Sequence, residues 1–302
     1  MFGMTNTQCS IAITTHNRKE DLSVTLEWLQ RYREDIVEII VCADGCTDGT
    51  QDFVRESYPE IILMENNPGR GSIPSRNRMI RAARSELVLL LDDDSYPVED
   101  GFFSAVECVM RECPEIGALT FPQRSDEFPE TLEQKDFGES QVVATFTSSG
   151  TVLRKELFKS LGGFPEMFFH AYEEPDFAVR LHAAGYKVVQ WNQLTVRHHF
   201  TGAMRDEGRT HRRHARNEFW STLIRAPWIL VLPMLCYRIF SQCRYACRRG
   251  FSWVVREPQW WWQAVGGIPE AVKQRCPVDT ASYRSWLRLF REPKPFIKEE
   301  PS

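Results

Sequence analysis

The sequence has no hydrophobic run long enough to cross a bilayer. Its longest apolar stretch, Ala226 to Cys236, contains two prolines, whereas a membrane-spanning helix needs about 20 predominantly apolar residues. Residues 1–10 have no basic region and no long apolar core, so a secretory signal is not expected. We therefore expect a cytoplasmic protein. Peripheral association with the inner face of the membrane is compatible with these features.

Paired cysteines are also lacking. The chain has 9 cysteines, an odd number, and none of them forms a Cys-x-x-Cys pair. This pattern argues against a disulfide framework and against a zinc site, and it favours reduced thiols in a cytosolic setting.

Positive charge is scarce in the first part of the chain. Residues 1–202 hold 19 Lys and Arg against 32 Asp and Glu, whereas residues 203–302 hold 18 against 9, together with seven of the 9 Trp. We therefore predict two parts, a catalytic domain over 1–202 and a basic, Trp-rich helical region over 203–302. Basic residues among tryptophans suit an anionic membrane surface, but helices that pack on the catalytic domain or across a homodimer fit the sequence equally well.

Short apolar strands alternate with amphipathic helices in the first hundred residues. The expected strands are Ser10–Thr15, Ile36–Cys42, Ile61–Met64 and Leu87–Leu91. Strands that alternate with helices indicate an α/β fold with a mostly parallel, doubly wound sheet. Ligands of such sheets bind outside the carboxyl ends of the strands.

Three aspartates, Asp92, Asp93 and Asp94, follow the fourth of these strands. Neighbouring strand residues point to opposite faces, so we expect Asp92 and Asp94 to share a side and Asp93 to point elsewhere. Hard cations prefer oxygen ligands, so Mg²⁺ or Mn²⁺ held against a diphosphate is the expected ligand. Solvated aspartates in a turn would give the same local pattern.

A second acidic group, Glu173, Glu174 and Asp176, lies at the expected start of a helix in which Pro175 suits the first position. The positive end of a helix favours ionised carboxylates, and a general base must be ionised. A cluster that only caps the helix would look the same.

Four motifs in order resemble the nucleotide-sugar motifs of family 2 glycosyltransferases with the GT-A fold. They are Thr-Thr-His-Asn-Arg, Ala-Asp-Gly-Cys-Thr-Asp-Gly-Thr, Asn-Pro-Gly-Arg-Gly with Ser-Arg-Asn, and Leu-Asp-Asp-Asp-Ser. The likeness continues through Gly162-Gly163-Phe164 and the Glu173 group, over roughly two-thirds of the chain. It departs from the family at Ala43, where the family has Asp, and at Glu174, where Asp is usual.

The resemblance implies a role for each matching residue. The donor half would be 1–97, with donor-binding residues Thr15, Asn17, Asp44, Arg70, Arg76, Asp92 and Asp93. Asp94 and His198 would bind Mn²⁺ or Mg²⁺, with His199 as the alternative ligand. The acceptor half would be 98–202, with Gly163, Phe164 and Glu173 near the acceptor, Glu174 as the base and Asp176 as the competing candidate.

The expected function is metal-dependent, inverting transfer of a sugar to a glycan or lipid-linked acceptor. A carboxylate at Asp44 can accept the imino proton of uracil or thymine, which favours a UDP or dTDP donor. The alternative is a catalytically silent protein of the same fold that binds nucleotide or scaffolds a glycan-assembly complex. A nucleic-acid partner is not expected, because the basic region has no recognisable reading motif.

Overall fold

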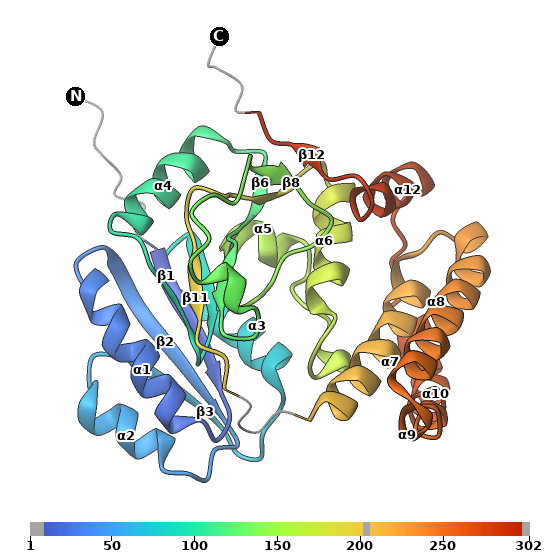
Figure 1. The fold of residues 1–302 in the computed structure, drawn as a ribbon, viewed down its shortest axis with the longest axis horizontal. Coiled ribbons are helices and arrows are strands. Elements are labelled where there is room, and N and C mark those ends of the chain that lie inside the picture. The colour runs from blue at the N-terminus through green and yellow to red at the C-terminus, as the bar shows by residue number, and fades with distance from the viewer. Residues whose placement is uncertain (1–8, 202–205, 298–302) are drawn as a thin grey trace.

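The computed structural model describes residues 9–201 and 206–297. Its main sheet has nine strands in the order β12-β8-β10-β6-β9-β4-β1-β2-β3 (Figure 1). The strands are β1 Cys9–Thr15, β2 Ile36–Asp44, β3 Ile62–Asn66, β4 Leu87–Asp92, β6 Ile116–Thr120, β8 Gln141–Val142, β9 Thr151–Arg154, β10 Lys187–Gln190 and β12 Lys294–Pro295. The helices around it are α1 Lys19–Leu29, α2 Thr50–Ser57, α3 Ser72–Ala82, α4 Phe102–Glu112, α5 Lys155–Ser160 and α6 Glu173–Ala183.

The four strands predicted near the N-terminus form one parallel group in the sheet. β1 pairs in parallel with both β2 and β4, and β2 pairs in parallel with β3. β9 lies antiparallel between β4 and β6, so the whole sheet is mixed. The predicted α/β fold is confirmed, and its strand ends gather the motif residues at one edge.

Both faces of this sheet are covered, which explains why β4 is apolar throughout. Leu89 packs in a core with α1, α2 and α4. Leu90, next along the strand, packs in a second core with α3, α5 and α6. Alternate residues of a strand point to opposite faces, so a strand buried on both sides needs a continuous apolar run.

A small second sheet carries the late histidines. It consists of β5 Ser95–Pro97, β11 Val196–His198 and β7 Gln123–Ser125, in that order. β11 runs antiparallel to β5 with His198 opposite Ser95. Because β5 starts three residues after the end of β4, this pairing brings His198 to the aspartates.

The C-terminal region is helical, as predicted. Its helices are α7 Glu207–Arg225, α8 Trp228–Arg249, α9 Phe251–Val254, α10 Glu257–Gly266, α11 Ile268–Lys273 and α12 Thr280–Leu289. Trp286 of α12 donates its indole N–H to the carbonyl of Ala144 at 2.7 Å, and Arg225 of α7 pairs with Asp176 of α6. The region therefore packs on the α/β part through specific polar contacts.

Within 9–201 and 206–297, none of the helices combines the length and the apolar character that a membrane crossing requires.

Candidate active site

Arg76 of α3 joins the two acidic groups that lie far apart in the sequence. Its Nη2 donates to Oδ1 of Asp92 at 2.6 Å and its Nη1 donates to Oε1 of Glu173 at 2.5 Å. The side chain of Glu173 is 1% exposed, whereas that of Asp92 is 32% exposed. The end of β4 and the start of α6 therefore meet at one guanidinium, whose planar fork suits two carboxylates.

Arg18, directly before α1, binds the other two aspartates. Its Nη1 donates to Oδ1 of Asp93 and its Nη2 to Oδ2 of Asp94, both at 2.7 Å. The predicted alternation is wrong, because β4 ends at Asp92 and the next two residues form a turn. Asp93 and Asp94 thus share one partner, and Asp92 has a different one.

The three carboxylates differ in environment. Burial raises the pKa of Asp93 to about 8, and its side chain is only 5% exposed. Burial acts in the same direction on Asp94, but His198 and Arg18 outweigh it and hold the pKa of Asp94 well below its usual range. Asp93 is thus bonded within the protein. The carboxylate of Asp92 is more exposed, so it is the one that a bound ligand can contact.

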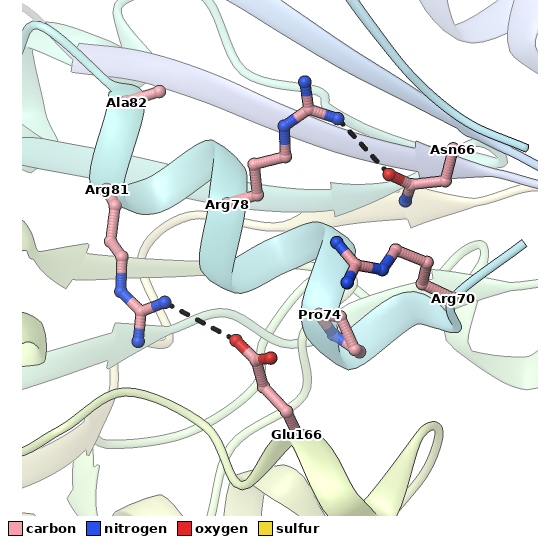
Figure 2. A pocket seen from close by; sticks show the side chains of 7 residues that line it. All are labelled: Asn66, Arg70, Pro74, Arg78, Arg81, Ala82 and Glu166. Carbon is pink, nitrogen blue, oxygen red and sulfur yellow. Dashed lines mark hydrogen bonds and ion pairs between the residues drawn. The ribbon is translucent and has the colours of Figure 1, made fainter.

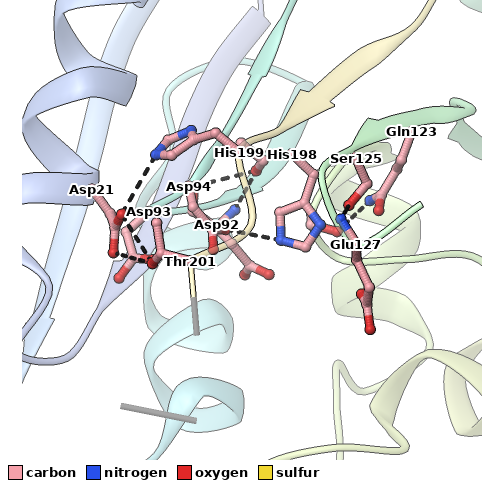
Figure 3. A network of polar contacts seen from close by, with 12 residues as sticks. Asp21, Asp92, Asp93, Asp94, Gln123, Ser125, Glu127, His198, His199 and Thr201 are labelled. Atoms are coloured by element: carbon pink, nitrogen blue, oxygen red, sulfur yellow. Dashed lines mark hydrogen bonds and ion pairs between the residues drawn. The ribbon is translucent and has the colours of Figure 1, made fainter. Parts of the chain in front are cut away.

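His198 lies beside Asp94, as Figure 3 shows. Its Nε2 is 3.1 Å from Oδ1 of Asp94. Two atoms at this separation can both bind a cation whose ligands lie about 2.1 Å away. A carboxylate with an imidazole suits Mn²⁺.

Asp94 and His198 together offer only a small set of metal ligands. Within the described parts of the chain, no three His, Cys, Asp or Glu side chains come together as a metal-binding group. Mg²⁺ in phosphate-transfer sites is commonly held by one or two carboxylates plus substrate phosphates and water. The pair therefore fits an ion that a nucleotide diphosphate helps to bind.

His199, the alternative ligand, lies elsewhere in the same network (Figure 3). Its Nε2 is 3.7 Å from Oδ1 of Asp21, and its ring packs against Tyr96. Its backbone N–H donates to the carbonyl of Asp94 at 3.0 Å. We conclude that His199 supports the turn, and that His198 is the better candidate ligand.

Residues 168–172, which lead into α6, have an unusual backbone. Three non-glycine residues have positive φ: Phe169 at 66°, Ala171 at 73° and Tyr172 at 70°. Such conformations cost of order 1–3 kcal/mol each and persist only when the surroundings impose them. Here the fully buried Asn217 of α7 donates to three carbonyls, those of Phe168, His170 and Ala171, at 3.1, 2.8 and 2.8 Å. The C-terminal region thus fixes where α6 begins.

Glu174 is the second residue of α6, so Pro175 occupies the third helical position and the predicted first position is wrong. The Glu174 side chain is half-buried, and its Oε1 accepts a hydrogen bond from the backbone N–H of Ser148 at 3.3 Å. Burial, followed by the negative charge of Glu173, raises the pKa of Glu174 to about 7. A carboxylate that titrates near neutral pH is well suited to accept a proton from a hydroxyl.

Asp176, the competing candidate, has a structural environment. Its carboxylate is fully buried and accepts from Arg180, Arg225 and Ser221 at 2.8–3.2 Å. Although burial opposes it, the pKa of Asp176 is lowered by Arg225 and Arg180. The bonds to Ser221 and Arg225 join α6 to α7, and the bond to Arg180 lies within α6. These bonds give Asp176 a structural role and argue against a role as base.

Asp44, at the end of β2, organises the loop before α3. Its Oδ1 accepts from the Arg70 N–H and Asn66 Nδ2 at 2.8 Å and from Ser75 Oγ at 3.2 Å, and its Oδ2 accepts from the Gly71 N–H at 2.8 Å. A carboxylate has about four acceptor sites. Protein donors take up much of this capacity, three of them on Oδ1 and one on Oδ2, and the bond of Asp44 to a nucleobase stays a prediction.

Thr15 and Asn17 lie at the carboxyl edge of the sheet. Thr15 ends β1 and is buried opposite Ala43. Asn17 uses its side-chain oxygen to accept from the Thr47 N–H at 2.6 Å. Both remain predicted donor residues, because this edge is where ligands of open α/β sheets bind.

Arg70 points into a hollow of about 440 Å³ on the outer face of α3 (Figure 2). Arg78 and Arg81 also line it, and Arg81 pairs with Glu166 at 3.5 Å. Arg78 is two residues from Arg76 on the helix and so lies on a nearly opposite face. The exposed Arg70 thus lies among other residues than the β4 aspartates in this structure, and its contact with a diphosphate stays a prediction.

The predicted acceptor residues are largely internal. Phe164 is 2% exposed and packs its ring on Phe158 and Phe177, and the buried Gly163 has a φ of +72°. Asn77 bonds both backbone groups of Phe164 at 2.9 Å. Glu173 is buried as well and pairs with Arg76, and the placement of these three residues near the acceptor stays a prediction.

Sequence reasoning did not assign two residues that position the site, Arg18 and Asn217. Arg18 closes the Thr-Thr-His-Asn-Arg motif, and its presence in that motif was a usable signal. Asn217 had none, because it lies in the C-terminal region and acts only through tertiary contacts.

Comparison with known proteins places these features in a family. Residues 10–171 match the profile of Glycosyl transferase family 2. The succinoglycan biosynthesis protein ExoA of Rhizobium meliloti is 27% identical over 203 residues, which cover 61% of each chain. The Escherichia coli glucosyltransferase WfaP, named for UDP-Glc and GlcNAc-diphosphoundecaprenol, is 32% identical over 88 residues, 29% of this chain and 35% of WfaP. The chain thus spans less than two thirds of either relative.

Two solved structures support the same fold. S. aureus TarS residues 1–349 in complex with UDP-GlcNAc aligns with a TM-score of 0.61 and 17% identity over 88% of this chain and 81% of that one. The mannosyltransferase PcManGT from Pyrobaculum calidifontis in complex with GDP-Man and Mn²⁺ aligns with a TM-score of 0.56 and 18% identity over 94% and 87%. The predicted GT-A fold is confirmed. Since the profile matches more than half of its length, the chain belongs to glycosyl transferase family 2.

Proposed function

We propose that the chain is a metal-dependent, inverting glycosyltransferase that moves a sugar from a nucleotide diphosphate donor to a hydroxyl of a glycan or lipid-linked acceptor. One observation carries the proposal: Arg76 bonds Asp92 and Glu173 together, so the aspartates after β4 and the carboxylates that start α6 belong to one site. Two acidic groups on separate surfaces would not support transfer.

The chemistry assigns a role to each group. Glu174 would accept the proton of the attacking hydroxyl. With a pKa of about 7 it is a stronger base than an ordinary glutamate, and a fraction of it is still ionised near neutral pH. Attack from the face opposite the leaving diphosphate inverts the anomeric centre and needs no covalent intermediate. A Mn²⁺ or Mg²⁺ ion held by Asp94 and His198 would offset the charge that develops on the diphosphate. Asp92, still partly exposed, would orient the donor near them.

We propose UDP or dTDP as the donor nucleotide. The support is the name of WfaP and the UDP-GlcNAc complex of TarS. Because PcManGT was solved with GDP-Man, GDP-sugars are the donors against which UDP- and dTDP-sugars should be compared.

The acceptor proposal rests on the relatives as well. The names of ExoA and WfaP refer to succinoglycan biosynthesis and to a diphosphoundecaprenol-linked sugar. We propose a role in cell-surface polysaccharide biosynthesis, at the cytoplasmic side of a membrane where a lipid-linked acceptor lies.

Donor hydrolysis and transfer, measured with UDP- and GDP-sugars in Mn²⁺ and in chelator, test the proposal. We expect turnover of a UDP- or dTDP-sugar only with metal. Glu174→Gln should abolish turnover and leave UDP-dependent thermal stabilisation intact. Donor binding without turnover in the unaltered chain, across the panel of sugars and acceptors, would favour the scaffold alternative.

A further inference from the structure

The outer face of α8 is apolar over its first half. Ile229, Leu232 and Phe240 are 72%, 70% and 65% exposed, although each is large and hydrophobic. Their spacing of three and eight residues places them along one side of the helix. This outer face is defined by these three residues.

The opposite side of α8 is fixed to the protein. Val231 and Arg238 are both buried. Arg238 donates to the hydroxyl of Tyr172 at 2.8 Å and pairs with Glu218 of α7. Because the inner face carries these contacts, the helix is held with its outer face turned away from the α/β part. Figure 1 shows α8 at the side of the molecule remote from the central sheet.

Positive charge accompanies the apolar residues. From Trp228 to Arg256 the sequence contains five arginines and no aspartate or glutamate. Arg244 and Arg248 lie exposed in the last two turns of α8, after the outer face. Phe251 of α9 follows them and is 81% exposed. Two of the five arginines are paired, Arg238 with Glu218 and Arg249 with Glu207. The surface therefore combines large apolar side chains with the exposed arginines Arg244 and Arg248.

This combination decides which partner fits. Apolar side chains next to arginines are typical of helices that lie in the interface of a membrane, with the apolar face inserted and the cations near lipid phosphates. A second copy of the same surface fits poorly, because a twofold contact would bring arginines together with no acid between Trp228 and Arg256 to pair with them.

We propose that the outer face of α8, continued by Phe251, is a docking surface for an anionic lipid bilayer. Ile229, Leu232 and Phe240 insert among the acyl chains near the headgroups, and Arg244 and Arg248 bind the anionic headgroups. The proposal deepens the membrane part of the proposed function but does not depend on sugar transfer.

Sedimentation with vesicles tests the proposal. The chain is mixed with vesicles of phosphatidylcholine alone or of equal parts phosphatidylcholine and phosphatidylglycerol, at low and high salt. We expect binding to the anionic vesicles that weakens with salt. Arg244→Gln with Arg248→Gln should lower the partition coefficient roughly fivefold per arginine, about 25-fold for the pair. Ile229→Ser with Leu232→Ser and Phe240→Ser should lower it roughly tenfold or more.

Matched controls separate this surface from general effects. Arg33→Gln with Arg111→Gln removes equal charge from the α/β part, and Phe128→Ser removes an exposed ring there; both should bind vesicles as the unaltered chain does. Glu174→Gln should also bind normally, so a failure of the proposed transferase would leave this result untouched. Circular dichroism confirms that each variant is folded.

Three results would overturn the proposal. They are equal binding to neutral and anionic vesicles, unchanged binding after the triple serine substitution, and a dimer in sedimentation velocity that the same substitution dissociates. The last result would make a second copy the occupant of the surface.

Discussion

Asp92 at the end of β4 and Glu173 at the start of α6 share the guanidinium of Arg76 at 2.6 and 2.5 Å. The pairing joins the two acidic motifs in one site. Removal of the buried arginine between them would leave a buried carboxylate without its partner. It also explains why the side chain of Arg76 is buried in a helix whose other arginines are exposed.

We predict that Arg76→Gln destabilises the chain by about 3–5 kcal/mol, since it leaves the buried Glu173 without its partner. Glu173→Gln combined with Arg76→Gln should recover a large part of this loss. Urea unfolding of both single variants and the double variant gives the coupling energy. Additive effects would show that the two side chains do not act as a pair.

The raised pKa of Glu174 predicts a pH-dependent rate. If Glu174 is the base, kcat/KM rises with pH and has its midpoint near the pKa of about 7. Glu173→Gln removes a neighbouring charge that raises this pKa, so the midpoint should move to lower pH. Rates measured from acid to alkaline pH test this, and an unmoved midpoint would assign the titration to another group.

The same shift predicts how stability depends on pH. The folded chain holds the Glu174 proton up to about pH 7, whereas an unfolded glutamate loses it near 4.3. The contribution of Glu174 therefore falls as pH rises through this window. Glu174→Gln should gain stability relative to the unaltered chain as pH rises from acid to neutral, which thermal unfolding at several pH values would measure.

Asp176 should behave unlike Glu174. Asp176→Asn leaves Arg180 and Arg225 without their buried anion, so we expect a loss of about 3–5 kcal/mol. Activity per folded molecule should persist, since Asp176 has no role in proton transfer. Thermal unfolding alongside initial rates separates stability from activity; a stable but inactive variant would restore Asp176 as a catalytic candidate.

Asn217 is predicted to position the base from a distance. Asn217→Ala removes three hydrogen bonds to residues 168–171, and the strained backbone before α6 should relax. We expect kcat to fall at least tenfold while the Kd for UDP changes little, because the donor edge is untouched. Equal losses in kcat and in UDP binding would indicate general unfolding.

Removal of His198 should weaken metal binding. His198→Ala takes one of two candidate ligands away, so the Mn²⁺ concentration for half-maximal stabilisation in the presence of UDP should rise tenfold or more. His199→Ala serves as the matched control and should change it much less. Thermal shifts across a Mn²⁺ titration measure both, and equal effects would mean that the two histidines act alike.

The sequence alone determined the α/β class, the parallel strands and the order of the motifs. These follow from local signals: a strand buried on both faces must be apolar along its length, as Leu87–Leu91 is, and the helices between strands repeat at helical period. The order of the four motifs was also enough to identify the resemblance to family 2 glycosyltransferases.

Only the tertiary structure decided which polar residues are available to a ligand. Asp44, Asp93 and Asp176 look like site residues in sequence, yet their carboxylates are occupied by protein donors that come from distant segments. Asn217 looks unremarkable but fixes the start of α6. Local sequence cannot reveal either case, because the partners meet only when the chain folds and hydrogen-bond capacity is shared among them.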